Sequence, residues 1–352
     1  MIKRVLFLCH PESDWQEMGI FDGLCRLLGD DNVITYPYKP TYYGLVDRNY
    51  KLPEGRYGFT SPPEQIPPRQ EGPWSKQRIL DHIDTFDLVY LASLRQVAVE
   101  AARELWSNIR HLPLAMTDTE DHEGYNISLV DEFTPVACFK RSLTPYLHER
   151  FPFLHPLPFS AIPYSSVNID DTKKTLDVFA VFGNTHPVRE ELAFILKALL
   201  PNLTNQPCHV GLAGNSFLGR YKGSAWGESH LPYKTYLQHI ASSRISFVIR
   251  GFGLEALRAW EVPLFETCAF WAYNPNWIYP YPFEDNRHVV YFREDLQDLP
   301  EKLDYYLHHT SQAMTIARAG KAHLYQYHTS DKRAAYMLDI ITRGSSNAPL
   351  SN

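Results

Sequence analysis

The chain has 352 residues, of which 44% are hydrophobic and 21% are charged, and its formal net charge is −6 at pH 7. This length exceeds what one ordinary hydrophobic core holds, so two domains are expected, and the composition is typical of soluble globular proteins. The negative net charge and the lack of a long basic run disfavour a general nucleic-acid binder, although a local basic groove is compatible with that average.

The five cysteines are scattered along the sequence without a CxxC pair. This pattern favours reduced, buried thiols of a cytoplasmic protein over a disulfide framework or a zinc site. The apolar run that follows Met1 is too short for a signal peptide or a membrane span, so no membrane-spanning segment is expected.

In the N-terminal half, short apolar runs alternate with segments of helical periodicity. The predicted strands are VLFLC (5–9), NVITY (32–36), DLVYLAS (87–93), LPLAMTD (112–118) and PVACFK (135–140). The periodicity predicts helices over 15–28, 75–84 and 94–111. Such alternation indicates a mostly parallel sheet that is covered by helices on both faces.

Two proline-rich stretches lack periodicity. Residues 37–74 predict a long loop, and loops of this length in compact domains are usually functional or disordered. Residues 150–175 predict the connection between two domains, with the linker itself at 161–175. The first domain is therefore expected over 1–160.

The C-terminal half repeats the alternation. The predicted strands are DVFAVFG (177–183), PCHVGLAG (207–214), RISFVIR (244–250), AFWAY (269–273) and HVVYF (288–292). The predicted helices are 187–200, 233–243, about 254–268, 296–308, 311–324 and 331–343. We expect a second domain over 176–330, and within 331–352 a helix that crosses back to the first domain. The expected fold is α/β, with two Rossmann-like doubly wound domains facing across a cleft at the carboxyl ends of their strands.

The stretch VFGNTHPVR (181–189) combines features of a phosphate site. A predicted strand ends at Gly183, Asn184 lies in the turn, and Arg189 opens a predicted helix. Glycine lets a ligand approach the backbone closely, and a helix N-terminus offers N–H groups and the positive end of a dipole. This arrangement suits a phosphate or diphosphate. A tight structural turn with a solvated Arg189 is an equally good interpretation of a lone glycine–arginine spacing.

A second turn, in RISFVIRGFGLEALRAWEVPLFETC (244–268), joins a predicted strand to a charged helix. The candidate nucleotide ligands that it adds are Arg250, Gly251, Gly253, Glu255, Arg258 and Glu266. A carboxylate there can accept hydrogen bonds from the two ribose hydroxyls, and arginines can form bidentate ion pairs with a diphosphate. The alternative is an amphipathic helix with solvated charges. Pro263 either kinks this helix or starts a new one, which would place Glu266 in its first turn.

Polar side chains also follow two strands of the N-terminal half, in CHPESDWQE (9–17) and MTDTEDHEG (116–124). His10, Asp14 and Asp118 are the candidates for a general base or a sugar-hydroxyl acceptor, and a solvated loop is the alternative. Their spacing matches no standard metal-ligand pattern. The sequence contains no GxSxG, P-loop, HExxH or glycine-rich dinucleotide motif, which disfavours a hydrolase triad, an NTPase and a dinucleotide enzyme.

An ordered set of motifs resembles a known family. In the C-terminal half these are VFGNTHPVR (181–189), FETCAFWA (265–272), PFEDNRHVVYF (282–292), DLPEKLDYYL (298–307) and ARAGKAHLYQYHTSDKRAAYML (317–338). In the N-terminal half they are MTDTEDHEGYN (116–126) and CFKRSLTPYLHERFPFLHPLPFS (138–160). The set resembles the spore maturation protein CgeB family and related group 1-like cytosolic glycosyltransferases.

The resemblance implies a two-domain glycosyltransferase fold of the B type. It implies a nucleotide-sugar held mainly on the C-terminal domain, an acceptor on the N-terminal domain, and no metal. The ribose-binding glutamate of the family falls on Glu266, with Glu255 as a competing alignment. Trp271 and Asn286 stand where the family has glycine, and Trp271 would reshape the donor pocket.

The preferred hypothesis is a metal-independent, hexosyltransferase-like enzyme that moves a sugar from a nucleotide diphosphate sugar to an unknown hydroxyl-type acceptor. No other cofactor is expected. One alternative is a non-catalytic nucleotide- or sugar-binding protein of the same fold. Another is a DNA-base glycosyltransferase, since residues 38–59 interleave Lys and Arg with Tyr, although the net charge disfavours nucleic acid without excluding it.

Overall fold

The computed structural model describes residues 2–11, 14–39, 42, 73–122, 124–163, 173–214 and 231–347. The chain divides into two compact units. Unit 1 comprises Met1–Ile162, Ile278–Pro280 and Thr329–Asn352, and unit 2 comprises Pro163–Trp277 and Tyr281–His328.

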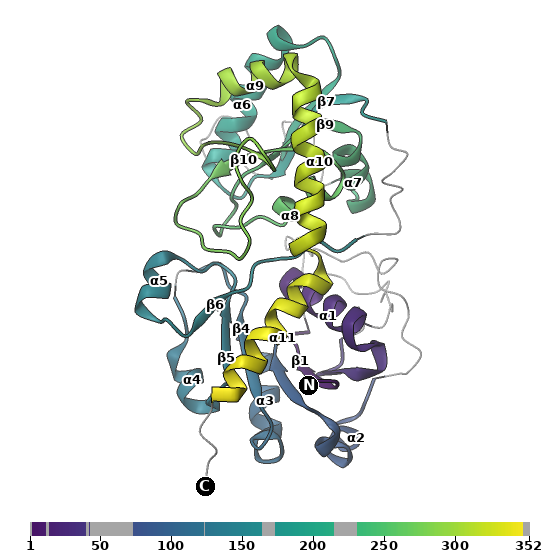
Figure 1. Ribbon diagram of the computed structural model, residues 1–352, viewed down its shortest axis with the longest axis vertical. Coiled ribbons are helices and arrows are strands. Elements are labelled where there is room, and N and C mark those ends of the chain that lie inside the picture. The colour runs from purple at the N-terminus through teal and green to yellow at the C-terminus, as the bar shows by residue number, and fades with distance from the viewer. Residues whose placement is uncertain are drawn as a thin grey trace. The chain divides into compact units, whose positions relative to one another are not determined.

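Unit 1 is built on a parallel sheet with the strand order β2-β1-β3-β4-β5-β6 (Figure 1). Its strands are β1 (Val5–Leu8), β2 (Val33–Tyr36), β3 (Leu88–Leu91), β4 (Leu114–Asp118), β5 (Ala137–Lys140) and β6 (Leu154–Pro156). The sheet grows in opposite directions from β1, which pairs with both β2 and β3. The edge strand β6 corrects the sequence prediction, because the proline-rich stretch at 150–175 contributes a strand of unit 1 before the chain leaves it. Pro156 is tolerated there since an edge strand need not donate on both sides.

The helices of unit 1 are α1 (Trp15–Leu28), α2 (Lys76–Asp81), α3 (Gln96–Ile109), α4 (Ile127–Phe133), α5 (Pro145–Arg150) and α11 (Ser330–Asn347). Helix α1 begins where the sequence predicts because Asp14 caps it. The Oδ1 atom of Asp14 accepts the N–H groups of Gln16 and Glu17 at 2.8 and 3.2 Å. The short helices α4 and α5 were not predicted, because one or two turns carry little periodicity.

Helix α11, from the C-terminal end of the chain, packs beside α1 in unit 1 (Figure 1). Gly23 of α1 makes this close packing possible. A Cβ atom at Gly23 would lie 2.1 Å from the backbone oxygen of Ser330 and 2.8 Å from Cβ of Ala334. A larger residue at position 23 would therefore push α11 away from α1.

Unit 2 also contains a parallel sheet, in the order β11-β10-β9-β7-β8. Its strands are β7 (Leu176–Gly183), β8 (Cys208–Ala213), β9 (Ser243–Val248), β10 (Cys268–Tyr273) and β11 (Val290–Arg293). The first strand of the unit, β7, pairs with both β8 and β9. Unit 2 therefore reverses its direction of growth at its first strand, as unit 1 does at β1.

The helices of unit 2 are α6 (Pro187–Leu203), α7 (Tyr233–Ala241), α8 (Arg258–Leu264), α9 (Leu299–His308) and α10 (Thr310–Tyr327). Helix α8 is shorter than predicted. Pro263 lies inside α8 and starts no new helix, so the alternative that would have placed Glu266 in a first helical turn does not hold. Glu266 instead follows the end of α8 with a left-handed φ of 53°.

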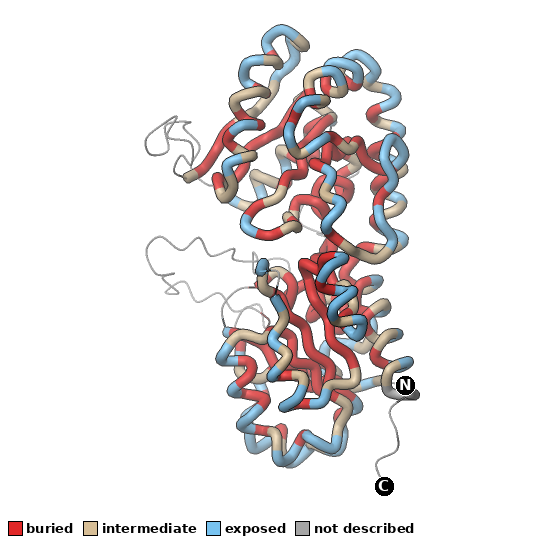
Figure 2. The backbone as a smooth tube through the Cα atoms, turned by 90° about the vertical axis from the view of Figure 1, so that its left-hand side faces the viewer, coloured by how far each residue is buried: buried red, intermediate tan, exposed pale blue. Residues whose placement is uncertain are grey.

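Each unit has its own hydrophobic core around its sheet, and the strands are the most buried segments (Figure 2). The sequence prediction of two parallel-sheet α/β domains is thereby confirmed. In the described parts of the chain, no helix has the length and apolarity that a bilayer crossing requires.

Candidate functional site

The carboxyl edge of the unit 2 sheet brings together several predicted ligands. Gly183 ends β7 and is followed by Asn184, whereas Arg250 and Gly251 follow the end of β9 after one residue, Ile249. Because β7 and β9 are parallel neighbours, these residues meet at the point where the sheet reverses its direction of growth. Open α/β sheets bind ligands outside such a point.

Arg189 is tied to the backbone at this edge. Its Nη1 and Nε atoms donate to the carbonyl oxygens of Gly183 and Arg250, both at 2.8 Å, and Nη2 donates to that of Ile249 at 3.1 Å. Burial, with a smaller effect of Arg258, lowers the pKa of Arg189 to about 10. The side chain therefore locks the ends of β7 and β9 together, and a direct ligand contact by Arg189 stays a prediction.

The absence of a side chain at Gly251 leaves space for the Arg189 guanidinium. A Cβ atom at Gly251 would lie 3.0 Å from Oγ1 of Thr185 and 3.1 Å from Nη2 of Arg189. The neighbouring Asn184 is buried, and its amide donates to Glu190 of α6 at 3.2 Å. The turn after β7 is thus held from both sides.

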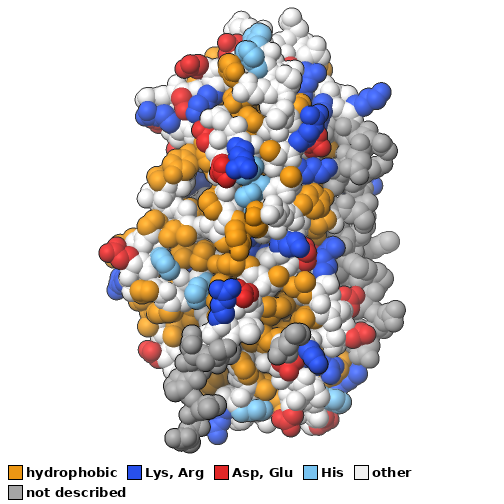
Figure 3. Space-filling model, viewed as in Figure 1, with side chains coloured by type: hydrophobic (Ala, Val, Ile, Leu, Met, Phe, Trp, Pro, Cys, Tyr) orange, Lys and Arg blue, Asp and Glu red, His pale blue; other side chains and the backbone are white. Residues whose placement is uncertain are grey.

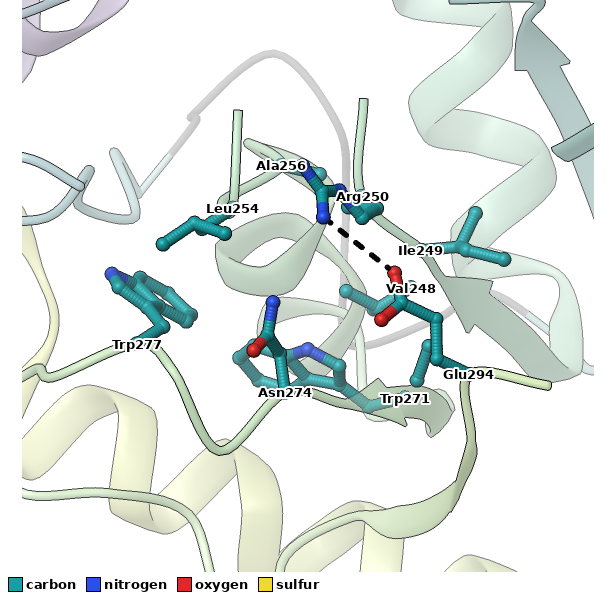
Figure 4. A pocket seen from close by; sticks show the side chains of 10 residues that line it. Val248, Ile249, Arg250, Leu254, Ala256, Trp271, Asn274, Trp277 and Glu294 are labelled. Carbon is teal, nitrogen blue, oxygen red and sulfur yellow. Dashed lines mark ion pairs between the residues drawn. The ribbon is translucent and has the colours of Figure 1, made fainter. Parts of the chain in front are cut away.

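A small pocket opens at the same edge, beyond Arg250 (Figure 4). Its lining includes Trp271, Asn274, Trp277 and Glu294. Figure 4 shows Arg250 turned toward Glu294, and the two side chains form an ion pair of 3.9 Å. The enclosed volume of about 10 Å³ is close to what one water molecule needs.

Three of these pocket residues, Asn274, Trp277 and Glu294, were not among the predicted ligands. Asn274 follows β10 and Glu294 follows β11. The rule that selected Gly183 and Arg250, polar residues directly after a strand, would have selected them too. Trp271 lines this pocket as well, and its expected effect on a donor pocket stays a prediction.

Arg258 and Glu255 lie deeper than predicted. Arg258 is 8% exposed, and its guanidinium donates to the hydroxyl oxygen of Tyr236 at 3.0 Å and to the carbonyl of Val181 at 2.5 Å. Glu255 is 5% exposed and accepts the indole N–H of Trp260 at 2.6 Å. The structure does not bring these two side chains to the open part of the pocket, although Gly253 lies in the turn that precedes them.

Glu261, which was not selected from the sequence, completes a buried polar chain with Arg258. Its carboxylate accepts the hydroxyls of Tyr233 and Tyr236 at 2.5 and 2.7 Å. Burial raises the pKa of Glu261. Tyr236 thus links the guanidinium of Arg258 to the carboxylate of Glu261.

Glu266 lies at the other edge of the unit 2 sheet. It precedes Cys268, the first residue of β10, whereas Gly183 is the last residue of β7. Its carboxylate forms ion pairs with Arg318 at 3.1 Å and Lys321 at 3.8 Å. The structure therefore separates Glu266 from Gly183 and Arg250 by the length of the strands.

In unit 1, the two candidate carboxylates, Asp14 and Asp118, form ion pairs. Besides capping α1, Asp14 pairs through Oδ2 with Arg95 at 3.5 Å. Asp118, at the end of β4, pairs through Oδ2 with the buried Lys140 at 3.0 Å and accepts the backbone N–H of Glu120 through Oδ1 at 2.9 Å.

The third candidate base, His10, follows β1 and is 9% exposed. Its backbone N–H donates to Glu17. All three candidates belong to the carboxyl edge of the unit 1 sheet, and their catalytic roles stay predictions.

No cluster of three or more His, Cys, Asp or Glu side chains with metal-binding geometry occurs among the residues that the structure describes. The stretch at 38–59, which motivated the DNA hypothesis, lies mostly outside those residues. On the face shown in Figure 3, basic side chains alternate with acidic ones.

Comparison with known proteins places these features in a family context. Residues 189–339, from α6 into α11, match the family model described as glycosyl transferase-like. No curated protein matches the chain.

Similar solved structures cover nearly the whole chain. A structure of Anabaena Alr3699/HepE in complex with UDP-glucose has a TM-score of 0.59 at 12% identity, over 97% of this chain and 99% of that one. A glycosyltransferase from Rickettsia africae ESF-5 has a TM-score of 0.57 at 11% identity, over 98% and 100%. AviGT4, a glycosyltransferase involved in avilamycin A biosynthesis, has a TM-score of 0.52 at 14% identity, over 98% of both chains.

At these identities the likeness establishes the fold, which is the B-type glycosyltransferase fold with two Rossmann-like domains. Together with the family match, it supports a group 1-like glycosyltransferase.

Proposed function

We propose that the protein transfers a hexose from a nucleoside diphosphate sugar to a hydroxyl group of an acceptor, without a metal ion. The observation that carries the proposal is the carboxyl edge of unit 2, where Arg250 borders a pocket inside the region that matches the glycosyl transferase-like family. HepE has been crystallised with UDP-glucose, so UDP-glucose is the first donor to test. A closer relation to the CgeB-like branch and a cytoplasmic location are part of the proposal.

In the proposed reaction the bond between the anomeric carbon and the diphosphate oxygen breaks, and a bond to the acceptor oxygen forms. The diphosphate leaves with the bonding electrons, and the acceptor hydroxyl loses its proton. Arg250 and the N-terminus of α6 stabilise the charge that develops on the diphosphate. If the reaction inverts the anomeric carbon, His10 is the preferred base, because histidine is the side chain whose ordinary pKa lies closest to neutral pH. The carboxylates of Asp14 and Asp118 form ion pairs with Arg95 and Lys140.

Calorimetry with a panel of nucleotides and nucleotide sugars tests the donor site. One of them is expected to bind, and Arg250→Ala is expected to weaken that binding about tenfold, which corresponds to one charged hydrogen bond. Arg287→Ala is the matched control, because Arg287 is 66% exposed and pairs with Glu284 in its own turn. EDTA is expected to leave binding and turnover unchanged. Failure of every nucleotide to bind folded protein would contradict the proposal.

A further inference from the structure

A fully buried carboxylate lies beneath the turn that carries His10. Both oxygens of Glu17 accept the backbone N–H of His10, at 3.0 Å for Oε1 and 3.3 Å for Oε2. Oε2 also accepts the ammonium of Lys39 at 3.0 Å and the hydroxyl of Tyr42 at 3.3 Å. One side chain of α1 therefore joins the turn after β1 to the segment that follows β2.

The cluster of Glu17, Lys39 and Tyr42 is closely packed. The side chains of Lys39 and Glu17 are 2% and 0% exposed. Tyr42 stacks on Phe21 of α1 with ring centroids 4.2 Å apart, and the Lys39 ammonium lies 4.7 Å from the centre of the Tyr42 ring. A buried ion pair of this kind adds little net stability over apolar residues of similar volume, so its presence calls for another role.

The direction of the Glu17 side chain indicates that role. Glu17 is the third residue of α1, where a glutamate commonly bonds back to the N–H of the capping residue. Here it reaches past the cap, Asp14, to the N–H of His10. The carboxylate is thus committed to the turn after β1.

We propose that Glu17 is a positioning residue for His10, and that the Glu17–Lys39 pair holds the His10 turn in the geometry that sugar transfer requires. This inference rests on the proposed function, in which His10 takes the proton of the acceptor hydroxyl. A catalytic group that moves by about 1 Å can lose roughly 100-fold in rate. A pinned turn prevents such movement.

The pair also makes the geometry sensitive to acid. Burial raises the pKa of Glu17, the nearby Asp14 raises it further, and Lys39 opposes both. The other titratable or charged groups that interact with this cluster are Cys9, Tyr90 and Arg95, and the backbone N–H of His10 also opposes the rise in the pKa of Glu17. Protonation of Glu17 removes the anionic partner of Lys39. Turnover should therefore decline on the acid side at a pH above the ordinary glutamate value of about 4.3.

Two double variants test the proposal without leaving a buried charge unpaired. Glu17→Gln with Lys39→Met keeps a side-chain oxygen for the His10 N–H, whereas Glu17→Leu with Lys39→Met removes it. The measurements are kcat for release of UDP from UDP-glucose, or of the diphosphate from whichever donor the calorimetric panel selects, the donor Kd, and hydrogen exchange of the His10 amide. All are normalised to folded protein.

We expect the Leu/Met variant to have a kcat about tenfold below that of the Gln/Met variant. Exchange at His10 should be faster in the Leu/Met variant, and the donor Kd should be the same in both. The part of the acid decline that Glu17 causes should be missing from both variants, whereas the decline that follows from protonation of the base itself should remain in all three proteins. Equal kcat values in the two variants would overturn the proposal.

Failure of the proposed function gives a different result. In that case the wild-type protein binds no nucleotide and releases no diphosphate from any donor. The exchange measurement needs no activity, so it still decides whether Glu17 holds the His10 turn. Equal exchange in the two variants would overturn the inference by itself.

Discussion

The two units place opposite charges at the same point of the same strand order. In each unit the third residue of the helix after the first strand reaches the carboxyl edge of the sheet, as Glu17 in unit 1 and Arg189 in unit 2. Glu17 accepts a backbone N–H and pairs with a buried lysine, whereas Arg189 donates to three backbone carbonyls.

The comparison shows that a charged residue near a strand end need not face a ligand. Both side chains use their hydrogen bonds to hold backbone segments of their own unit. The pocket of unit 2 is lined instead by other residues, such as Arg250 and Glu294. Four predictions sharpen or break this comparison.

The largest effect is expected for Glu17→Leu alone. This change leaves the buried Lys39 without its carboxylate, and breaking a buried ion pair in this way costs about 3–5 kcal/mol of unfolding free energy. Urea unfolding measures the loss. The added change Lys39→Met should restore much of the stability, because no buried charge then remains. A single variant as stable as the wild-type protein would show that the pair is not buried in solution.

Arg189→Met is expected to lower the unfolding free energy of unit 2 by about 3 kcal/mol. The physical reason is the loss of hydrogen bonds to the carbonyl groups of Gly183, Ile249 and Arg250. Urea unfolding followed by hydrogen exchange of the β7 and β9 amides reports on unit 2, whereas tryptophan fluorescence would also report on unit 1 through Trp15, Trp74 and Trp106. Arg189→Lys should recover only part of the loss, since an ammonium lacks the planar fork. A loss below about 1 kcal/mol would refute a structural role of this guanidinium.

Acid is expected to weaken unit 2 by about 1–3 kcal/mol. Burial and the stacked His323 lower the pKa of His288 from 6.5 to about 4. Glu284 and Arg287 also act on His288, with opposite signs. A depressed histidine pKa favours the neutral form in the folded state, so this stability is complete above pH 6.5 and is lost as pH falls toward 4.

The matched variant for this pH effect is His288→Asn. Asparagine keeps an acceptor for the N–H of Glu284, which bonds to Nδ1 of His288 at 3.1 Å, but takes up no proton. Thermal unfolding between pH 7 and pH 4 should therefore show a flatter pH dependence in the variant. Identical slopes in the two proteins would rule out His288 as the source. In unit 1 the raised pKa of Glu17 contributes with the opposite sign, so acid should affect the two units unequally.

The smallest effect is expected for Glu266→Ala. Its ion pairs with Arg318 and Lys321 are partly exposed, so the loss of unfolding free energy should stay below about 0.5 kcal/mol. Calorimetry should find the same donor Kd as in the wild-type protein, because Glu266 lies at the opposite edge of the sheet from Arg250. A weaker donor affinity would restore the ribose role that the family resemblance implied.

Much of the fold was predictable because its signals are local. Helix α1 spans the predicted 15–28, since the cap at Asp14 and the apolar periodicity are both encoded nearby. The misses are short elements. Strand β6 lies in a proline-rich stretch, a composition that predicts a loop and not a strand. Helices α4 and α5 are too short for a periodic pattern.

The candidate site was predictable only in part. Gly183, Arg250 and Gly251 were placed correctly at a strand's carboxyl end, because that position follows from the apolar run before them. Glu294 was missed although it follows β11 in the same way. The sequence left open whether Pro263 lies within a helix or starts a new one. The structure has the helix begin at Arg258, without a side-chain cap, and places Pro263 inside it.

The sequence by itself determined the alternation of strands and helices, the two parallel sheets and the turns in which charged residues lie. Hydrophobic periodicity and helix capping involve residues that are close in sequence, so they can be recognised from the sequence alone. Only the tertiary structure decided which partners those charges meet. The guanidinium of Arg189 donates to the carbonyl oxygen of Arg250, just beyond β9, which lies 61 residues further along the chain. Such a pairing depends on strand register and on burial by distant segments, which no local pattern encodes.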